Sequence, residues 1–321
     1  MINNPLVSVV IINFNSGKFI WRCLEALGKQ TYKNLEICVV DNASTDGSSE
    51  RLQNIDEKDF NYYRFENNVG SSMANNYGIK NSKGECVLIL NADVFLSEDY
   101  IEKSIIAFSK DTKIGTVTGK LLSESNHNII DTTGIILFKE GVGHERGMGE
   151  EDKGQYDIED YVVGACCAAA MYKREMLEEI RYEDEYYDED YFAFVEDLDL
   201  SVCATLLGWK TLYTYKVLAY HVRGGSTSSM SDFVKYLNIR NSEIFFDKFL
   251  KNNKKVFIYH FILKVLRYFT INKKIRKDVA ISLKELKSKQ LDKRLYFSKK
   301  IEYIYLEPFL KNSYVLKRLF K

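Results

Sequence analysis

VVDNASTDGS, at residues 39–48, passes from an apolar segment directly into acidic and polar side chains. LILNADV at 88–94 repeats this change, and FVEDLDL at 194–200 and AYHVRGGS at 219–226 follow further along the chain. An apolar strand that ends in a carboxylate holds a charge at the open edge of a parallel sheet, which is where α/β folds bind ligands. Several such charges together predict a nucleotide or metal–phosphate site.

The segments around these motifs alternate between strand and helix patterns. Strands are expected at 7–12, 35–40, 61–65, 85–90, 211–213 and 217–220, and helices at 18–29, from 46, at 71–82, from 97 and at 196–207. This alternation predicts an α/β fold with a mostly parallel, doubly wound sheet. The segment 138–156 is rich in Gly and charge, and a loop of this length is usually a functional lid or disordered.

Length and composition allow one large domain or one domain with an appendage, since the chain has 321 residues and is 45% hydrophobic. The six cysteines lie mostly in apolar runs without a CxxC pair, which predicts buried, reduced thiols rather than a disulfide framework. The apolar run at 7–12 is too short for a signal peptide. We therefore expect a cytoplasmic protein.

The net charge of zero conceals an acidic body and a basic tail. Residues 231–321 hold 23 Lys and Arg against 8 Asp and Glu, a net charge of +15, which leaves 22 basic and 37 acidic residues in 1–230. We therefore divide the chain into a body, 1–230, and a basic helical extension, 231–321. Basic tails bind anionic surfaces, and because this one has no recognised nucleic-acid module, an anionic membrane is the expected partner.

Within the extension, Val256 to Phe269 is almost wholly apolar, and its basic residues His260, Lys264 and Arg267 form one stripe on a helix. The segment is too interrupted for a clean membrane span. Two interpretations stay open. The helix lies in a membrane interface, or it packs on the body with a solvated basic stripe.

Individual residues in the motifs have both a structural and a chemical interpretation. Asp93, at a strand end, is either a helix cap or a cation ligand, with Asn91 able to add a neutral oxygen. Glu196 and Asp197 suit the first turn of a helix, but the aromatic residues before them would desolvate a carboxylate and make it a usable base. His221 is either structural or, beside Arg223, a metal or phosphate ligand.

The motifs IINFNS, VVDNASTDGS, NNVGSSMANNYGI, GECVLILNADV, YDEDYFAFVEDLDL and HVRGGS, in this order, resemble the family 2 glycosyltransferases over about residues 6–245. The resemblance implies the GT-A fold and an inverting transfer of a sugar from a nucleotide diphosphate sugar. The chain looks most similar to the rhamnosyltransferase-like branch that builds bacterial surface polysaccharides. GQYD at 154–157 and GACCAAAMYKREML at 164–177 support this branch.

The resemblance also implies roles for single residues. Asp197 matches the catalytic base, with Glu196 beside it, and Asp93 and His221 match metal-ligand positions. The nucleotide-binding positions are Asn13, Phe14, Asn15, Asp41, Asn68, Gly70, Asn75, Asn91 and Arg223.

The implied cofactor is a divalent metal, Mg²⁺ or Mn²⁺, and the implied acceptor is a glycan or a lipid-linked molecule at the inner face of the cell membrane. Asn91 departs from the family's Asp-x-Asp motif, which should weaken metal binding by the free enzyme. Two alternatives remain. A nucleotidyltransferase would need a Gly-rich, basic loop after the first strand, and IINFNSGKF is a poor version of it. A non-catalytic protein that binds nucleotide sugars or membranes would not need Asp93, Asp197 and His221.

Overall fold

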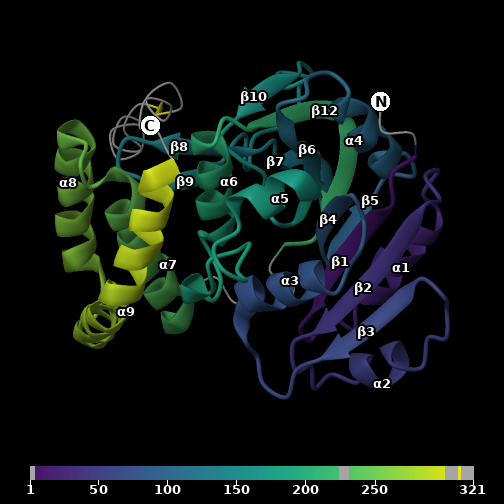
Figure 1. Ribbon diagram of the computed structural model, residues 1–321, viewed down its shortest axis with the longest axis horizontal. Helices are drawn as coiled ribbons and strands as arrows, with labels where there is room; N and C mark the ends of the chain where they lie inside the picture. Colours follow the sequence, from purple (N-terminus) through teal and green to yellow (C-terminus); the bar gives the residue numbers. More distant parts are fainter. Residues whose placement is uncertain (1–3, 224–230, 301–309, 312–321) are drawn as a thin grey trace.

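The computed structural model describes residues 4–223, 231–300 and 310–311 (Figure 1). Gly224, Gly225 and Ser226 of the last motif lie outside the described residues.

The strands alternate with helices through the first hundred residues, as expected. The strands are β1 (Val7–Asn13), β2 (Leu35–Asp41), β3 (Phe60–Arg64), β4 (Cys86–Asn91), β5 (Val94–Leu96), β6 (Ile114–Ser123), β7 (Asn126–Thr132), β8 (Ile135–Phe138), β9 (Gly143–Glu145), β10 (Asp160–Val162), β11 (Ala169–Lys173), β12 (Lys210–His221) and β13 (Leu310–Lys311). The helices are α1 (Ile20–Gly28), α2 (Ser48–Leu52), α3 (Gly70–Lys80), α4 (Tyr100–Phe108), α5 (Arg174–Ile180), α6 (Glu196–Leu206), α7 (Asp232–Phe245), α8 (Lys254–Thr270) and α9 (Lys273–Lys300), with a 3₁₀ turn η1 (Glu189–Tyr191) and a π-helical turn η2 (Phe246–Leu250).

The main sheet has the strand order β10-β12-β6-β11-β4-β1-β2-β3. β3, β2, β1 and β4 are parallel, and β6 and β12 are parallel to each other on the far side of the antiparallel strand β11. The chain leaves β1 for β2 on one side and later returns to β4 on the other. This reversal creates a switch point, where parallel sheets bind ligands at the carboxyl ends of their strands.

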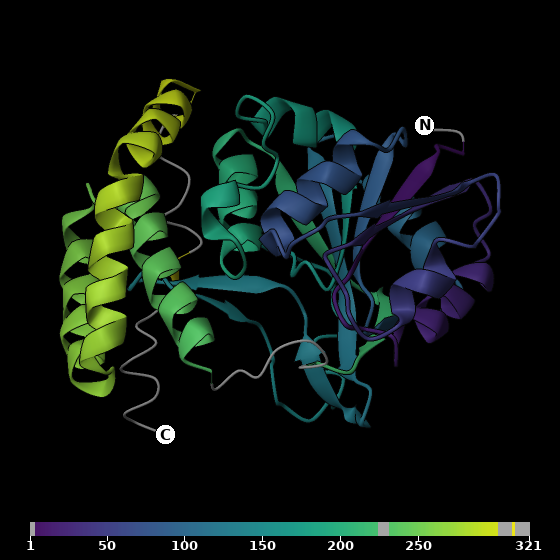
Figure 2. The same ribbon diagram turned by 90° about the horizontal axis from the view of Figure 1, so that it is seen from below.

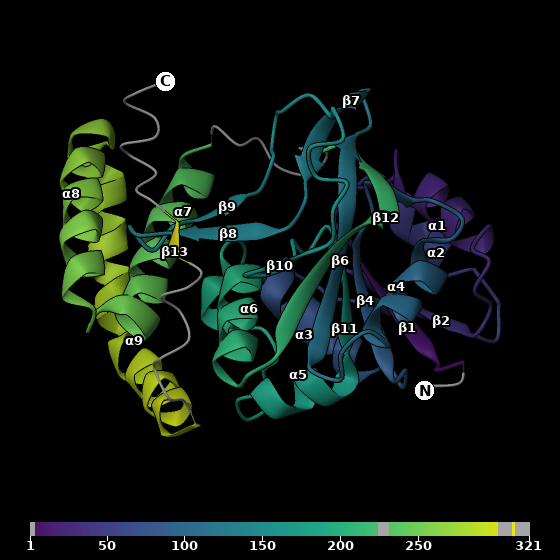
Figure 3. The same ribbon diagram turned by 90° about the horizontal axis from the view of Figure 1, so that it is seen from above.

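Alternating side chains of the strands supply two separate cores. On β1, Val7, Val9 and Ile11 pack with α1, α2 and α4, whereas Val10 faces the core that contains α3, α5 and α6. This period of two is that of a strand buried on both faces. The result is a sheet between two helical layers, as Figure 3 shows, so the predicted α/β class is confirmed.

The segment 138–156 is largely irregular, as expected for a loop, except that Gly143–Glu145 forms β9. This strand pairs antiparallel with β8, so that Ile135 lies opposite Glu145. Figure 3 shows this pair reaching from the sheet toward α7. The two short strands expected at 211–213 and 217–220 are one strand, β12, with a register shift between Thr214 and Leu218.

Helices α7, α8 and α9 lie together at one side of the molecule, away from β3 (Figures 1 and 2). Phe245 of α7, Phe249 of the adjoining turn η2 and Phe297 of α9 belong to the same buried cluster as Val10 and Ile89 of the sheet. All six cysteines are free, as predicted. In the described part of the chain, no helix combines the length and apolar character needed to cross a membrane.

The basic stripe of α8 is not solvated throughout. His260 is buried, with Nδ1 2.9 Å from the carbonyl oxygen of Glu140, and it also bonds Glu243 of α7. Lys264 bonds the same glutamate at 2.5 Å. The outward face of α8 is apolar instead and exposes Phe257, Ile258, Phe261, Ile262, Val265, Leu266, Tyr268 and Phe269.

Candidate active site

A cavity of about 610 Å³ opens at the carboxyl edge of the sheet. It is lined by ten of the residues singled out in the sequence, namely Phe14, Asn68, Gly70, Asn75, Asn91, Asp93, Glu196, Asp197, His221 and Arg223. Asn13, Asn15 and Asp41 do not line it. The motifs that are far apart in the chain therefore meet in one place.

Asp93 and His221 form the pair expected to hold a metal. Antiparallel pairing places His221, at the end of β12, opposite Val94 of β5, directly after Asp93. As a result Oδ1 of Asp93 lies 3.4 Å from Nε2 of His221, and both side chains are largely buried.

Asp131, on β7, was not identified from the sequence. Its Oδ2 accepts a hydrogen bond of 2.8 Å from Nδ1 of His221, and its Oδ1 accepts one of 2.5 Å from Nε of Arg223. Burial alone would lower the pKa of His221, but Asp131 and Asp93 raise it to about 9. An imidazole anchored through Nδ1 presents Nε2 to a cation, and such carboxylate–histidine pairs are typical of metal sites.

The carboxylates Glu196 and Asp197 lie in the first turn of α6, where the helix dipole favours negative charge. Asp197 is partly exposed to the cavity, whereas Glu196 is buried. Oε1 of Glu196 accepts a hydrogen bond of 2.6 Å from Ser71 of α3. Among the described residues, its Oε2 has no partner. Burial raises the pKa of both carboxyl groups, and the charge of Asp197 raises that of Glu196 further.

Glu145, at the end of β9, is a second residue that sequence reasoning did not find. One carboxylate oxygen of Glu145, the thiol of Cys166 and one carboxylate oxygen of Asp197 lie within 4.8 Å of one another. Burial, followed by the charge on Asp197, raises the pKa of Glu145 to about 7. The only signal in the sequence was a charged residue inside the Gly-rich segment 138–156, which gave no spatial information.

The opposite wall of the cavity comes from the loop before α3 and from α3 itself. Gly70 has a φ of +84°, and a Cβ there would lie 2.3 Å from the carbonyl oxygen of Phe192, so only glycine fits. Asn75 is buried, and its Oδ1 has no hydrogen-bond partner among the described residues. A buried polar atom of this kind on a cavity wall suits a polar ligand.

Asp41, at the end of β2, is not one of the residues that line the cavity. It is fully buried and accepts hydrogen bonds from Nδ2 of Asn13 at 2.7 Å and from the hydroxyl of Ser49 at 2.8 Å. Asn15 is exposed, and its Oδ1 accepts a hydrogen bond of 2.8 Å from the backbone N–H of Thr45. These contacts tie together the loops after β1 and β2, and a role for the three residues in nucleotide binding stays a prediction.

The family model for glycosyl transferase family 2 matches residues 8–181. The chain belongs to this family. It is 27% identical over 244 residues to the glycosyltransferase GlyA of Streptococcus pneumoniae, covering 71% of this chain and 32% of GlyA. It is 28% identical over 223 residues to an N-acetylglucosaminyltransferase of Bradyrhizobium diazoefficiens, covering 67% of this chain and 44% of that protein. The chain thus spans less than half the length of either relative.

Solved structures with the same fold are more distant in sequence. The mannosyltransferase PcManGT of Pyrobaculum calidifontis, solved with GDP-Man and Mn²⁺, aligns with a TM-score of 0.56 at 17% identity, over 89% of this chain and 76% of that one. GalNAc-T7, solved with UDP, GalNAc and Mn²⁺, aligns with a TM-score of 0.64 at 16% identity, over 90% and 57%. The expected GT-A fold is confirmed.

Proposed function

We propose that this protein is an inverting glycosyltransferase that moves a sugar from a nucleotide diphosphate sugar to a hydroxyl group. One observation carries the proposal: the pair Asp93–His221 and the carboxylate of Asp197 line the same cavity. That combination provides a place for a diphosphate leaving group and a base for the attacking hydroxyl. The family membership supports the same reaction.

The donor is proposed to lie between β1 and α3. Phe14 offers an aromatic surface to the nucleotide base, and Asn75 offers an unpaired buried oxygen to a sugar or ribose hydroxyl. The two solved proteins above hold a GDP-sugar and UDP, so both nucleotides are candidates. Rhamnose remains the proposed sugar of the branch that this sequence resembles, in the synthesis of a bacterial surface polysaccharide.

The residues at the sheet edge fit a divalent cation, either Mg²⁺ or Mn²⁺. Asp93 and His221 would hold it, with Asp131 fixing the imidazole by its hydrogen bond to Nδ1. Two protein ligands leave most of the coordination shell to phosphate oxygens and water, which matches the neutral Asn91 in place of an acid. The bound cation would supply charge neutralisation of the leaving diphosphate.

Asp197 is the proposed base. Its carboxylate takes the proton of the acceptor hydroxyl while the acceptor oxygen forms a bond to the anomeric carbon. The bond from that carbon to the diphosphate oxygen breaks, and the configuration inverts. Burial favours this role because a raised pKa makes the carboxylate a stronger proton acceptor. Glu196 is bonded to Ser71 and supports the turn that carries Asp197.

The test is a transfer and donor-hydrolysis screen with UDP-, GDP- and dTDP-sugars, comparing the wild type with Asp197→Asn. An amide cannot take the proton, so we expect turnover to fall by at least about 100-fold while nucleotide binding persists. Asp184→Asn, at an aspartate whose side chain is 82% exposed, is the matched control. Normal turnover in Asp197→Asn would exclude Asp197 as the base. Transfer of a nucleoside monophosphate to the acceptor, with release of a sugar 1-phosphate instead of a nucleoside diphosphate, would favour a nucleotidyltransferase.

The extension is proposed to hold the enzyme at the cytoplasmic face of the membrane, where a lipid-linked acceptor would be found. The support is the outward apolar face of α8 together with exposed lysines near both of its ends, Lys254, Lys273 and Lys274. A helix of this type lies in the membrane interface and does not span it. Leu263 belongs to the face that packs on the protein and takes no part.

A further inference from the structure

The backbone just before α6 has an unusual conformation. Phe192, Phe194 and Val195 have φ angles of 64°, 69° and 74°, in the left-handed region that residues other than glycine rarely adopt. Val195 is β-branched, which makes its conformation still less favourable. Such a segment keeps its shape only when its surroundings hold it. Asp197 follows two residues later, so whatever holds the segment also places Asp197.

Side chains of helix α7 form hydrogen bonds with the backbone of this segment. The side-chain amide of Asn241 donates hydrogen bonds to three carbonyl oxygens, those of Tyr191, Ala193 and Phe194, at 3.0, 2.8 and 2.7 Å. The guanidinium of Arg240 donates to the carbonyl oxygens of Asp190 and, again, Tyr191, at 2.7 Å each. All of these hydrogen bonds are accepted by backbone carbonyl oxygens, so they depend on the conformation of the segment and not on its side chains.

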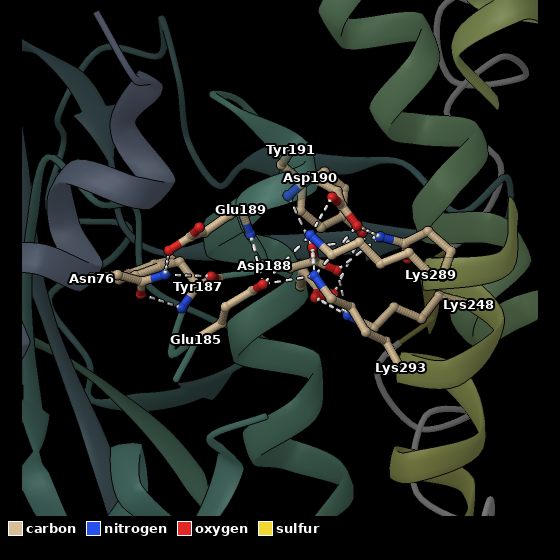
Figure 4. A network of polar contacts seen from close by, with 12 residues as sticks. Asn76, Glu185, Tyr187, Asp188, Glu189, Asp190, Tyr191, Lys248, Lys289 and Lys293 are labelled. Carbon is tan, nitrogen blue, oxygen red and sulfur yellow. Dashed lines mark hydrogen bonds and ion pairs between the residues drawn. The ribbon is translucent and has the colours of Figure 1, made fainter. Parts of the chain in front are cut away.

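Two buried lysines of the extension bind acidic residues in this segment and in α6 (Figure 4). Nζ of Lys248, in η2, lies 2.6 Å from Asp199 of α6 and 3.1 Å from Asp188. Nζ of Lys293, in α9, lies 2.6 Å from Glu185 and also bonds Asp188. The two lysine side chains are only 2% and 1% exposed. The flanking carboxylates more than offset burial and raise the pKa of both lysines, so both are charged.

Helix α3 holds the same segment from the other side. The side chain of Asn76 bonds the backbone of Tyr187 in both directions, and the N–H of Ser72 donates to the carbonyl oxygen of Phe192. Figure 4 shows Asn76 on one side of the acidic residues and the lysines on the other. The segment 185–195 is therefore held between α3 on one side and the C-terminal extension on the other.

We propose that the C-terminal extension positions the catalytic base, with Asn241, Lys248 and Lys293 as positioning residues that hold segment 185–195 so that α6 begins with Asp197 facing the cavity. The inference rests on the proposed role of Asp197. The extension is then needed for catalysis itself, because it positions Asp197, and this role is separate from any membrane contact.

The experiment compares Asn241→Leu, which keeps the side-chain size but removes the donors, with the wild-type full chain. We expect kcat to fall by about 100-fold, the cost of misplacing a reacting group by about 1 Å. The KM for the donor should stay within twofold, because the wall formed by Phe14, Asn68 and Asn75 is untouched. Hydrogen exchange of residues 185–197 should accelerate, with that of β1 and β4 unchanged. If Asn241 served stability alone, its replacement would not lower kcat while leaving the KM for the donor unchanged.

Lys289→Met provides a milder variant that should fold, because Lys289 is half exposed and bonds Asp190 at 2.8 Å. Lys289→Met should also lower kcat and accelerate the hydrogen exchange of residues 185–197, but less than Asn241→Leu does. Lys287→Met, an exposed lysine on the same helix, is the matched control and should change nothing. Wild-type kcat and wild-type exchange of 185–197 in Lys289→Met and in soluble Asn241→Leu would overturn the inference. If the wild type uses no donor, the proposed function fails, whereas the exchange data still report whether the extension holds the segment.

Discussion

Asp131 determines how His221 and Arg223 can act, although nothing near it in the sequence indicated a site. A lone histidine after a strand is most often structural, and His221 would have stayed ambiguous without its partner. Strand β7 folds back on β6 and brings the carboxylate to the imidazole Nδ1 and to the guanidinium. One buried aspartate thereby fixes two groups that were predicted to meet metal and diphosphate.

Asp93→Ala should abolish the increase in nucleotide affinity that Mn²⁺ or Mg²⁺ produces, while metal-free binding stays close to wild type. Calorimetric titration of a nucleoside diphosphate with and without the cation measures this. The cation must displace the proton from Nε2 of His221, whose pKa is raised to about 9, so the enhancement should grow as the pH rises from about 7 toward 9.

Two further variants make this titration specific. Asp56→Ala, at an exposed aspartate between α2 and β3, should behave as wild type. Asn91→Asp adds an anionic oxygen on the cavity wall and should strengthen cation binding in the absence of nucleotide. A full cation effect in Asp93→Ala would leave Asp93 with only a structural role.

Among the elements, those built from local pattern could be predicted and those built from distant contacts could not. The strands β1, β2 and β4 begin and end within one residue of the expected bounds, because buried parallel strands are continuous apolar runs. The β8–β9 pair depends instead on remote packing. A Cβ on Gly141, which has a φ of +76°, would lie 2.7 Å from Leu250, more than a hundred residues away.

The site divides in the same way. Residues at or just after the end of a strand, such as Asp93 and His221, could be placed at the site, because the carboxyl ends of the parallel strands meet at one edge. Asp131 and Glu145 lie on antiparallel additions whose register follows from tertiary contacts. Sequence pattern carries no information about such pairing, so these two carboxylates could not have been found.

Helix α8 leads to a prediction about membranes. The double variant Phe261→Ser, Phe269→Ser should reduce binding to anionic liposomes by roughly 30-fold, since about 2 kcal/mol of apolar transfer free energy is removed from side chains that are 57% and 80% exposed. Co-sedimentation measures it. Binding of the wild type should also weaken with salt, because each basic residue contributes about 1 kcal/mol that salt screens.

Ile158→Ser is the control for this experiment, because Ile158 is 73% exposed but lies far along the chain from α8. Its liposome binding should equal that of the wild type. If the wild type stays in the supernatant with anionic liposomes at low salt, α8 does not bind membranes, and its apolar face covers some other surface.

The whole molecule is joined more tightly across residue 230 than a division into a body and an extension implies. Domain boundaries fall where few contacts cross. Here Phe245, Phe249 and Phe297 share a buried cluster with residues of β1 and β4. Lys248 and Lys293 place their charges among carboxylates of the body, so part of the tail's positive charge is neutralised internally. Removing either lysine would take one cation away from a buried group of carboxylates, which is strongly destabilising.

The last prediction follows from this shared core. In a denaturant titration of the full chain, the helix signal in far-UV circular dichroism, which includes that of α7 to α9, and the fluorescence of Trp21 and Trp209, which lie in the body, should be lost at the same midpoint. Coincident probes are the test for one cooperative unit. Lys293→Met should lower both midpoints together, and Lys287→Met should lower neither. If helix signal is lost before the fluorescence changes, the extension unfolds on its own and the division at residue 230 is correct. In that case the contacts of the extension with segment 185–195 contribute little to folding, since the extension would separate from α3 and the segment while the sheet remains intact.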